Sequence, residues 1–374
     1  MMPVLGVVRD LKNMLKAIKL SGFKSIREME VELKKINVLI GANGAGKSNF
    51  IDFFRLLISL SNKRLQFYLR RNGGANALLH YGIKRTQKIT SQIELNTDNG
   101  NGVYGFTLSL APVNTLIIEE DTHPNSTAIG KVGEESVFFL DRQDNKPNTP
   151  LNKAMRNEIN RYRAFHFHDT SETTYMRGNC DINNNRILQR DGSNLAAVLY
   201  KLQQTQKAYY ERIVKTIRQI APFFEDFVLE PLTVSPHEIQ LRWQACDSDY
   251  EFGPHQLSDG TLRTMALITL LLQPEEDLPS LIILDEPELG LHPYAISMIA
   301  ALIRSASVYT QVILATQSTN LLDHFEAEEL IIVEQQQGIS LFKRLDSDKL
   351  TTWLEDYALS ELWEKNVIGG SPSR

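Results

Sequence analysis

Apolar and polar residues alternate in two parts of the chain, which predicts β-strands. Near the start, two β-rich stretches, Leu15–Phe23 and Met29–Leu39, flank a short polar turn. Farther on, alternating segments and the hairpin signal Asp98-Asn99-Gly100 predict an antiparallel β lobe. The strands of this lobe are expected at Ile89–Asn96, Val103–Ala111, Thr115–Glu120 and Val137–Leu140.

Helical spacing of apolar residues follows in other parts of the chain. One such stretch begins near Asn49 and predicts a helix after the glycine-rich turn. A second runs from Leu195 to Ile220, is closed by Pro222, and predicts one long amphipathic helix. In the last third, helices expected at Thr261–Leu272 and Pro293–Ser305 alternate with short apolar strands. Those strands are expected at Leu281–Leu284, Val312–Ala315 and Leu330–Val333. The alternation predicts an α/β fold with a mostly parallel sheet, into which the antiparallel lobe is inserted.

Composition indicates the cellular compartment of the protein and says little about its activity. The 374 residues carry 40 basic and 45 acidic side chains, which give a net charge of -5. The chain as a whole therefore lacks the excess of basic residues that is typical of proteins that bind nucleic-acid phosphates. Two cysteines cannot form a disulfide framework, which favours a reducing compartment. No apolar run reaches the roughly 18–20 residues of a membrane span, and residues 1–8 do not resemble a secretory signal. We therefore expect a cytoplasmic protein without membrane contact.

A glycine-rich motif follows the apolar run Ile36–Ile40. It matches the P-loop pattern G-x-x-x-x-G-K-[ST], whose glycines let backbone N–H groups surround a phosphate at a helix N-terminus. Lys47 is expected to reach the β- and γ-phosphates, and the Ser48 hydroxyl to ligate Mg²⁺. Asn43 is favoured as a phosphate ligand and Asn49 as a residue that satisfies the helix start. The expected nucleotide-binding residues are Gly41, Ala42, Asn43, Gly44, Ala45, Gly46, Lys47, Ser48 and Asn49.

Two adjacent carboxylates end the apolar strand Leu281–Leu284. The carboxyl ends of parallel strands face the ligand crevice of an α/β sheet. Asp285 is therefore expected to hold Mg²⁺, and Glu286 to orient and deprotonate an attacking water.

A second candidate anion site precedes the helix Thr261–Leu272. Ser258, Asp259 and Gly260 lie at its N-terminus, where the helix dipole favours negative charge. Taken alone, Ser-Asp-Gly is more often a helix cap. Because the chain has one P-loop, the sequence leaves open which bound phosphate this second anion site would contact.

These motifs resemble those of the ATP-binding-cassette superfamily, and within it the ATPase heads of SMC and RecF-like proteins. More narrowly, the chain is similar to a bacterial group of stand-alone predicted AAA-type (AAA_21-like) ATPases. The resemblance covers nearly the whole chain from about Leu15. It rests on the P-loop and on Gly22–Ser25, Leu257–Arg263, Asp285–Pro293, Ala315–Ser318, Trp353–Tyr357, Glu361–Asn366 and Gly369–Gly370.

The resemblance implies an ATP sandwich in which Ser258 and Gly260 of one copy contact the γ-phosphate bound by the other. Glu288–His292 matches the D-loop of such a dimer. Gln317 stands where many relatives have the switch histidine, and slow hydrolysis is expected because glutamine cannot carry a proton charge. The lobe-linking glutamine is Gln66 or Gln92, and the sequence does not choose between them.

The resemblance also implies a subdivision of the chain. An N-terminal extension, 1–14, precedes an ATPase head, 15–374. Within the head we expect a P-loop part at 15–60, a β-rich lobe at about 61–190, a helical insertion at about 191–250, a signature and Walker B part at about 251–345 and a helical tail at about 346–374.

The function implied is an ATP- and Mg²⁺-dependent switch that forms a homodimer and controls a separate effector protein or a DNA transaction, as in bacterial anti-phage defence. The alternative is the ATPase of a DNA repair, recombination or nuclease complex that acts directly on DNA. About 45 residues follow Leu330, too few for a toprim nuclease domain, and Asp346-Ser347-Asp348 is the only Asp-x-Asp spacing there. A small-molecule kinase would not need the Ser258 element, and a transporter subunit would carry a different signature.

Two other clusters are weighed. His166 and His168 share a face and could be half a metal site, although a structural role is favoured. The basic and aromatic stretch Lys63–Arg71 could contact nucleic acid, although a solvated helix end with buried aromatics is favoured.

Overall fold

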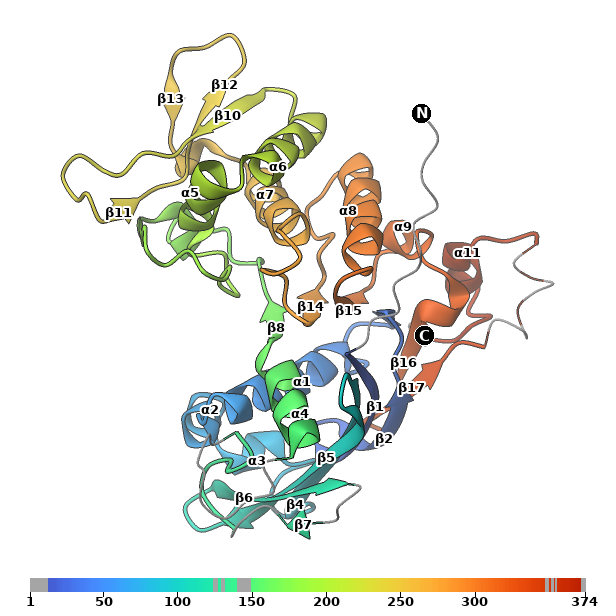
Figure 1. The fold of residues 1–374 in the computed structure, drawn as a ribbon. Helices are drawn as coiled ribbons and strands as arrows, with labels where there is room; N and C mark the ends of the chain where they lie inside the picture. Colours follow the sequence, from blue (N-terminus) through green and yellow to red (C-terminus); the bar gives the residue numbers. More distant parts are fainter. Residues whose placement is uncertain are drawn as a thin grey trace. The chain divides into compact units, whose positions relative to one another are not determined.

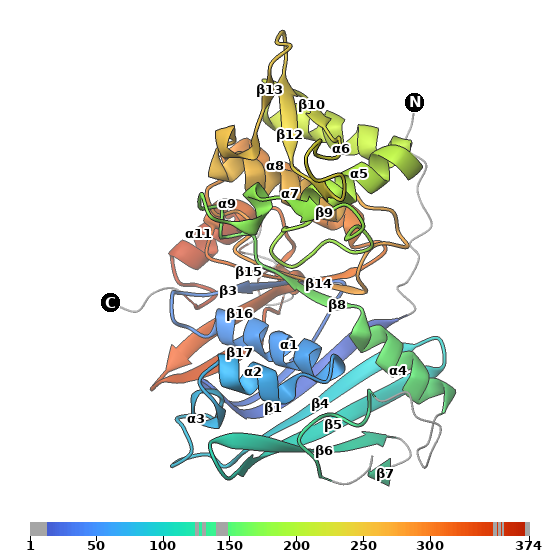
Figure 2. The ribbon, with the colours of Figure 1, turned by 90° about the vertical axis from the view of Figure 1, so that its left-hand side faces the viewer.

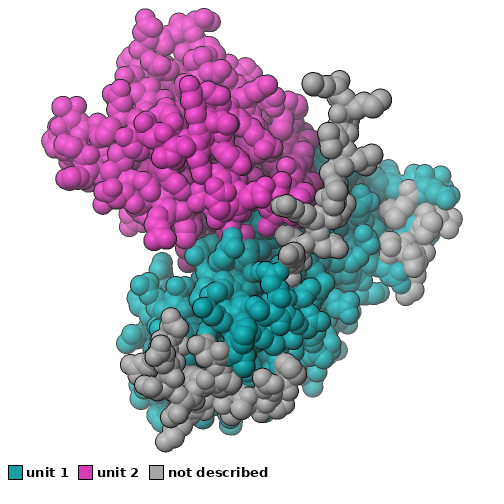
Figure 3. Space-filling view, viewed as in Figure 1, with its two compact units in different colours: residues 1–164, 280–283, 310–374 teal, residues 165–279, 284–309 magenta. Residues whose placement is uncertain are grey.

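The computed structural model describes residues 13–123, 127–128, 132–139, 149–346, 350, 353 and 355–370. The chain divides into two compact units, which Figure 3 shows in separate colours. Unit 1 comprises residues 1–164, 280–283 and 310–374, and unit 2 comprises residues 165–279 and 284–309. The predicted subdivision of the chain stays a prediction, and its N-terminal extension falls mostly outside the described residues.

One layer of unit 1 is a six-stranded antiparallel sheet in the order β2-β1-β4-β5-β6-β7 (Figure 2). Its strands are β1 Met14–Phe23, β2 Ile26–Glu32, β4 Lys88–Thr97, β5 Gly100–Ala111, β6 Thr115–His123 and β7 Thr127–Ala128. β1 pairs with β4 from Met14 opposite Asn96 to Ser21 opposite Thr90. The predicted lobe therefore extends a sheet that starts at the beginning of the described chain.

A second six-stranded sheet has the order β17-β16-β3-β15-β14-β8. Its strands are β3 Ile36–Ile40, β8 Tyr162–Phe165, β14 Leu281–Asp285, β15 Gln311–Thr316, β16 Leu330–Gln336 and β17 Ile339–Arg344. β3 runs parallel to both β15 and β16, whereas β17 returns antiparallel to β16. All of β3 and β15 is buried, as is typical of parallel strands covered on both faces. The predicted α/β fold with a mostly parallel core sheet and an antiparallel lobe is confirmed.

Helix α1, Lys47–Ser61, packs between these two sheets (Figure 2). Its buried Phe53 lies edge-on to Phe23 of β1 and stacks on Phe106 of β5, with ring centroids 6.2 and 6.4 Å apart. Residues of α1 and of both sheets belong to one buried apolar cluster, so the helix after the P-loop is fixed by this core. The other helices of unit 1 are α2 Leu65–Arg71, α3 Ala75–Leu78, α4 Pro150–Asn160, α9 Thr319–Leu322, α11 Leu359–Glu364 and the 3-10 helix η3 Ala327–Glu329.

The strand predicted at Val137–Leu140 is wrong over its described residues 137–139, which form a bend and turn. The buried Glu120 carboxylate accepts the backbone N–H groups of Val137 and Phe138 at 2.7 and 3.0 Å. A side chain thus replaces the neighbouring strand as hydrogen-bond partner, and Phe138 packs flat on Tyr104. Leu140 lies outside the described residues.

Unit 2 combines helices with short strands (Figure 1). Its helices are α5 Leu195–Thr205, α6 Lys207–Ile220, α7 Asp259–Leu271, α8 Pro293–Ala306 and the 3-10 helices η1 Tyr175–Arg177 and η2 Pro254–Gln256. β10 Phe224–Val228, β12 Arg242–Ala245 and β13 Glu251–Phe252 form one sheet, and β9 Cys180–Asp181 pairs with β11 Glu238–Ile239.

The single long helix predicted from Leu195 to Ile220 is wrong, because the chain leaves helical geometry at Gln206 and forms α5 and α6. Both helices bury their apolar faces, including Leu202 before the break and Tyr210 after it. The spacing of eight residues between these two stays in phase with a helix, so the apolar pattern continues across the break. Among the described residues, no helix is long and apolar enough to cross a membrane.

Candidate functional site

The P-loop connects β3 to α1 in unit 1 and leaves an open cradle. Gly44 has a φ of +79°, and a Cβ built there would meet nothing within 4 Å. Asn43, Gly44 and Ser48 are exposed, whereas Lys47 is buried. The Lys47 ammonium donates to the carbonyl oxygens of Gly41 at 2.5 Å and Ala42 at 3.1 Å. The loop therefore holds its lysine beside a space without side chains, as binding of an anionic ligand requires.

A chain of polar side chains supports the loop from behind. The Ser340 hydroxyl donates to the Ala45 carbonyl at 2.6 Å and lies 2.6 Å from the Ser25 hydroxyl, which also accepts from the Asn49 amide at 2.6 Å. A Cβ on Gly46, where φ is +118°, would lie 2.1 Å from Ser340 Oγ. Only glycine therefore fits this turn, and the Asn49 side chain supports the loop from the first turn of α1.

Gln317 lies beside the P-loop in the same unit. In the parallel pairing of β15 with β3, Thr316 is opposite Ile40. Gln317 and Gly41 are the next residues of these two strands, so both emerge at the same edge of the sheet. The structure thus brings the P-loop and Gln317, which the resemblance places at the switch position, to the same edge of the sheet.

The acidic pair belongs to unit 2. Asp285 is the last residue of β14, and Glu286 has a φ of +40°, an unusual backbone conformation for a residue with a side chain. Both are half-buried beside a cavity of about 10 Å³, roughly the room for one water. The ring nitrogen Nε2 of His168 lies 3.4 Å from the backbone oxygen of Glu286. Backbone strain of this kind is concentrated at functional sites.

Ser258 caps α7 and remains exposed. Its Oγ accepts the backbone N–H of Thr261 at 3.2 Å, so the helix-cap interpretation is correct as far as it goes. The same Oγ lies 2.8 Å from the Thr261 hydroxyl oxygen, and the Ser258 side chain is exposed to solvent. A Cβ on Gly260 would meet the backbone oxygen of Gly290 at 2.7 Å, so the start of α7 packs closely on the predicted D-loop, Glu288–His292.

Arg177, which the sequence analysis missed, holds the residues that precede α7. The side chain is buried, and its guanidinium donates to the carbonyl oxygens of Thr170 at 3.0 Å, Leu257 at 3.1 Å and Pro254. It also donates to the exposed Asp259 carboxylate at 2.8 Å. Thr170, Arg177, Leu257 and Asp259 line a hollow of about 700 Å³ together with Ser258. Asp259, predicted to bind a ligand, is thus held by an arginine of its own chain.

Arg263 is a second missed arginine, on α7 itself. The side chain is buried and donates to the carbonyl oxygens of Phe167 at 3.0 Å, His168 at 3.2 Å and Leu289. Burial lowers the pKa of this guanidinium, and the Asp259 charge opposes that effect. Arg263 therefore ties α7 to the D-loop and to the segment that contains His168.

The two candidate lobe-linking glutamines lie outside the parallel sheet. The Gln66 amide of α2 donates to the carbonyl oxygens of Leu116 and Glu134, each at 2.8 Å. Gln92 is exposed on β4 of the antiparallel sheet. His166 and His168 have ring centroids 4.2 Å apart, yet no group of three or more metal-ligating side chains occurs within the described part of the chain.

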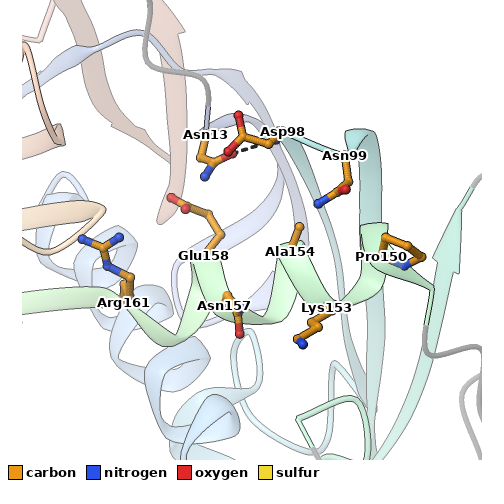
Figure 4. A pocket seen from close by; sticks show the side chains of 9 residues that line it. All are labelled: Asn13, Asp98, Asn99, Pro150, Lys153, Ala154, Asn157, Glu158 and Arg161. Atoms are coloured by element: carbon orange, nitrogen blue, oxygen red, sulfur yellow. Dashed lines mark hydrogen bonds between the residues drawn. The ribbon is translucent and has the colours of Figure 1, made fainter. Parts of the chain in front are cut away.

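A polar hollow of about 360 Å³ lies apart from these motifs, beside α4 in unit 1 (Figure 4). Lys153, Asn157, Glu158 and Arg161 contribute one wall, and Asp98 with Asn99 contributes the other. No predicted site residue lines it.

Comparison with known proteins gives a family and a fold. The family AAA_21, described as "AAA domain, putative AbiEii toxin, Type IV TA system", matches residues 36–323. The DNA replication and repair protein RecF of Renibacterium salmoninarum is 33% identical over 91 residues, which cover 23% of this chain and 23% of that protein. The chain thus spans about a quarter of this curated relative.

Solved structures of SMC heads share the fold of about nine-tenths of this chain. An SMC head bound to the C-terminal winged-helix domain of ScpA has a TM-score of 0.60 at 17% identity, with 90% of this chain and 99% of that chain covered. The SMC head of Pyrococcus furiosus, with an extended coiled coil and bound to the C-terminal domain of ScpA, has a TM-score of 0.57 at 15% identity and covers 92% and 99%.

Proposed function

Because the chain belongs to the AAA_21 family and is an SMC/RecF-like ABC-type P-loop ATPase by family and fold, we propose that it is an ATP-driven switch. In this proposal ATP closes a homodimer, and Mg²⁺-dependent hydrolysis reopens it. The observation that carries the proposal is the open P-loop cradle of Gly44 beside Lys47, with Gln317 at the same sheet edge.

Each site residue receives a role from its own chemistry. Lys47 leaves its two loop carbonyls to bind the phosphates, and the backbone N–H groups of the loop surround them. Ser48 and Asp285 would hold Mg²⁺, since hydroxyl and carboxylate oxygens are the ligands this ion prefers. An Mg²⁺ ion held by these two side chains would supply positive charge to the β- and γ-phosphates. Glu286 takes a proton from the attacking water, and Gln317 donates to the γ-phosphate or to that water.

The candidate anion site at the start of α7 supports dimerisation of the chain. Ser258 is exposed at the positive end of α7, and Gly260 brings the backbone of that helix close to the D-loop. We assign both to the γ-phosphate held by a second copy of the chain. The family description, the RecF name and the ScpA-bound heads all support an output through another molecule, and we propose an effector protein, as in anti-phage defence.

The experiment that tests this proposal is the replacement Glu286→Gln. The variant should bind ATP, accumulate as an ATP-dependent dimer and release little phosphate, because the amide cannot accept the proton of water. Mass by light scattering with and without ATP, together with phosphate release, measures both effects. The control Glu275→Gln alters an exposed carboxylate of the same unit and should behave as wild type. Wild-type turnover by Glu286→Gln would remove this residue from the role.

A second candidate is an ATPase that acts directly on DNA, which the RecF relative favours. Helix α2 and the residue before it expose Arg64, Phe67, Arg70 and Arg71, so the aromatic Phe67 is available rather than buried as expected. The outer face of the antiparallel sheet, however, carries the exposed carboxylates Glu28, Glu30, Glu32 and Glu119, which repel phosphates. Salt-sensitive stimulation of hydrolysis by duplex DNA, lost on replacing Arg70 and Arg71 by glutamate, would favour this candidate.

A further inference from the structure

The C-terminal residues Leu359–Gly370 reach back to the P-loop within unit 1. The backbone N–H of Ala42 donates to the Gly370 carbonyl at 2.9 Å, and the Gly370 N–H donates to Glu334 Oε1 at 2.8 Å. Gly370 is buried, and a Cβ built on it would lie 3.0 Å from Ile332 and 3.6 Å from Gly41 Cα. The second residue of the P-loop is thus held by a segment more than 300 positions away in the sequence.

Both glycines of this segment need their residue type. Gly369 has a φ of +83° and Gly370 a φ of +79°, in the left-handed region that favours glycine. A Cβ on Gly369 would lie 2.4 Å from the Glu334 carboxylate. A side chain at either position would therefore strain the backbone and push the segment away from β16 and the loop.

The other end of the segment is fixed near Gln317, the residue that follows β15. The Asp323 carboxylate accepts the backbone N–H of Ser360 at 2.9 Å and its hydroxyl at 2.7 Å. Asp323 ends α9, which starts two residues after Gln317. Leu362 and Trp363 are buried and anchor α11 between these two contacts.

We propose that Leu359–Gly370 is a positioning brace, which holds the P-loop and the Gln317 segment in the relative arrangement that binds ATP. The inference rests on the proposed function of the P-loop. Ala42 is the second residue of the motif, and its N–H points to Gly370 rather than into the cradle at Gly44. The brace therefore leaves the phosphate-binding part of the loop open and acts on the geometry of the loop alone.

The test compares Gly370→Ala with Gly100→Ala. Both replace a glycine of positive φ, but Gly100 lies at the β4–β5 turn, where a Cβ would meet nothing within 4 Å. Titration with a fluorescent ATP analogue should show affinity reduced about tenfold in Gly370→Ala and unchanged in Gly100→Ala, because loss of the equivalent of one hydrogen bond changes a binding constant by about this factor. In steady-state hydrolysis, KM for ATP should rise while kcat changes less.

A second pair of variants keeps the test decisive if Gly370→Ala folds poorly. Glu334→Gln retains an oxygen that accepts the Gly370 N–H and should bind the analogue as wild type does, whereas Glu334→Ala should lose affinity. Equal binding by Glu334→Ala, Gly370→Ala and wild type would overturn the brace. Failure of the wild-type chain to bind the analogue at all would instead overturn the proposed function.

Discussion

Glu158 of α4 is a carboxylic acid whose ionisation the fold opposes. The side chain is buried beside the polar hollow of Figure 4. Burial raises its pKa, while the Ser280 hydroxyl and the Arg161 charge lower it by less. A carboxyl that keeps its proton to higher pH when folded binds more protons in the native state, so its contribution to stability is present at acid pH. That contribution is lost as pH rises through the raised pKa.

We therefore expect Glu158→Gln to raise the thermal unfolding midpoint at pH 7. The gain should shrink as pH falls towards 4, where the carboxyl of the wild-type chain is neutral as well. Thermal unfolding between pH 4 and 8 measures this trend, with the exposed Glu119→Gln as the control that should show no such pattern. A lower midpoint for Glu158→Gln at pH 7 would mean that the carboxylate gains more from its neighbours than burial costs.

Some residues of the candidate site could be predicted from the sequence and others could not. Lys47, Asp285 and Glu286 could be predicted as site residues because each stands in a contiguous motif next to an apolar strand. Arg177 could not, because its partners are chiefly backbone carbonyl groups, which every residue has and no pattern marks. The role of Arg177 can be recognised only in the folded chain, where the Thr170 and Leu257 carbonyl groups surround its guanidinium.

At the scale of elements, the start of α7 depends on that arginine. Arg177→Met keeps much of the apolar stem but removes every hydrogen bond to the Thr170, Pro254 and Leu257 carbonyls. The Pro254 carbonyl still accepts the backbone N–H of Leu257 at 3.3 Å, so Thr170 and Leu257 have the carbonyls that lose a donor. Buried acceptors without partners cost about 1–3 kcal/mol each, so the unfolding free energy should fall by about 2–6 kcal/mol. Urea titration measures the loss, and the exposed Arg186→Met should lose far less. Equal stability of the two variants would show that the carbonyls find other donors.

The errors in predicting elements have a common cause. Apolar spacing reports which face is buried, and it continued through Gln206, where the backbone of α5 ends. It also marked Val137–Leu140, whose described backbone groups bond to the Glu120 carboxylate instead of a strand. In both places the backbone conformation depends on hydrogen-bond partners and packing that involve residues distant in the sequence, and periodicity does not contain that information.

For the whole molecule, the proposed sharing of each ATP site between two copies predicts complementation between two inactive chains. Lys47→Ala lacks the lysine proposed to bind phosphate, and Ser258→Ala lacks the hydroxyl proposed to contact the γ-phosphate of the other copy. When the two are mixed, half of the randomly formed dimers are mixed, and each contains one intact site of two. Phosphate release should return to about a quarter of the wild-type rate. Each variant alone supplies the control, and no recovery on mixing would mean that one chain completes its own site.

The polypeptide passes between the two units four times, at residues 164/165, 279/280, 283/284 and 309/310. Neither unit is therefore encoded by one uninterrupted stretch of gene. The boundaries at 164/165 and 283/284 fall within β8 and β14, so a cut at either position would divide a strand. An engineer who wishes to exchange the 165–279 segment for that of another family member must consequently graft at two junctions and leave the whole of β14, Leu281–Asp285, in its host.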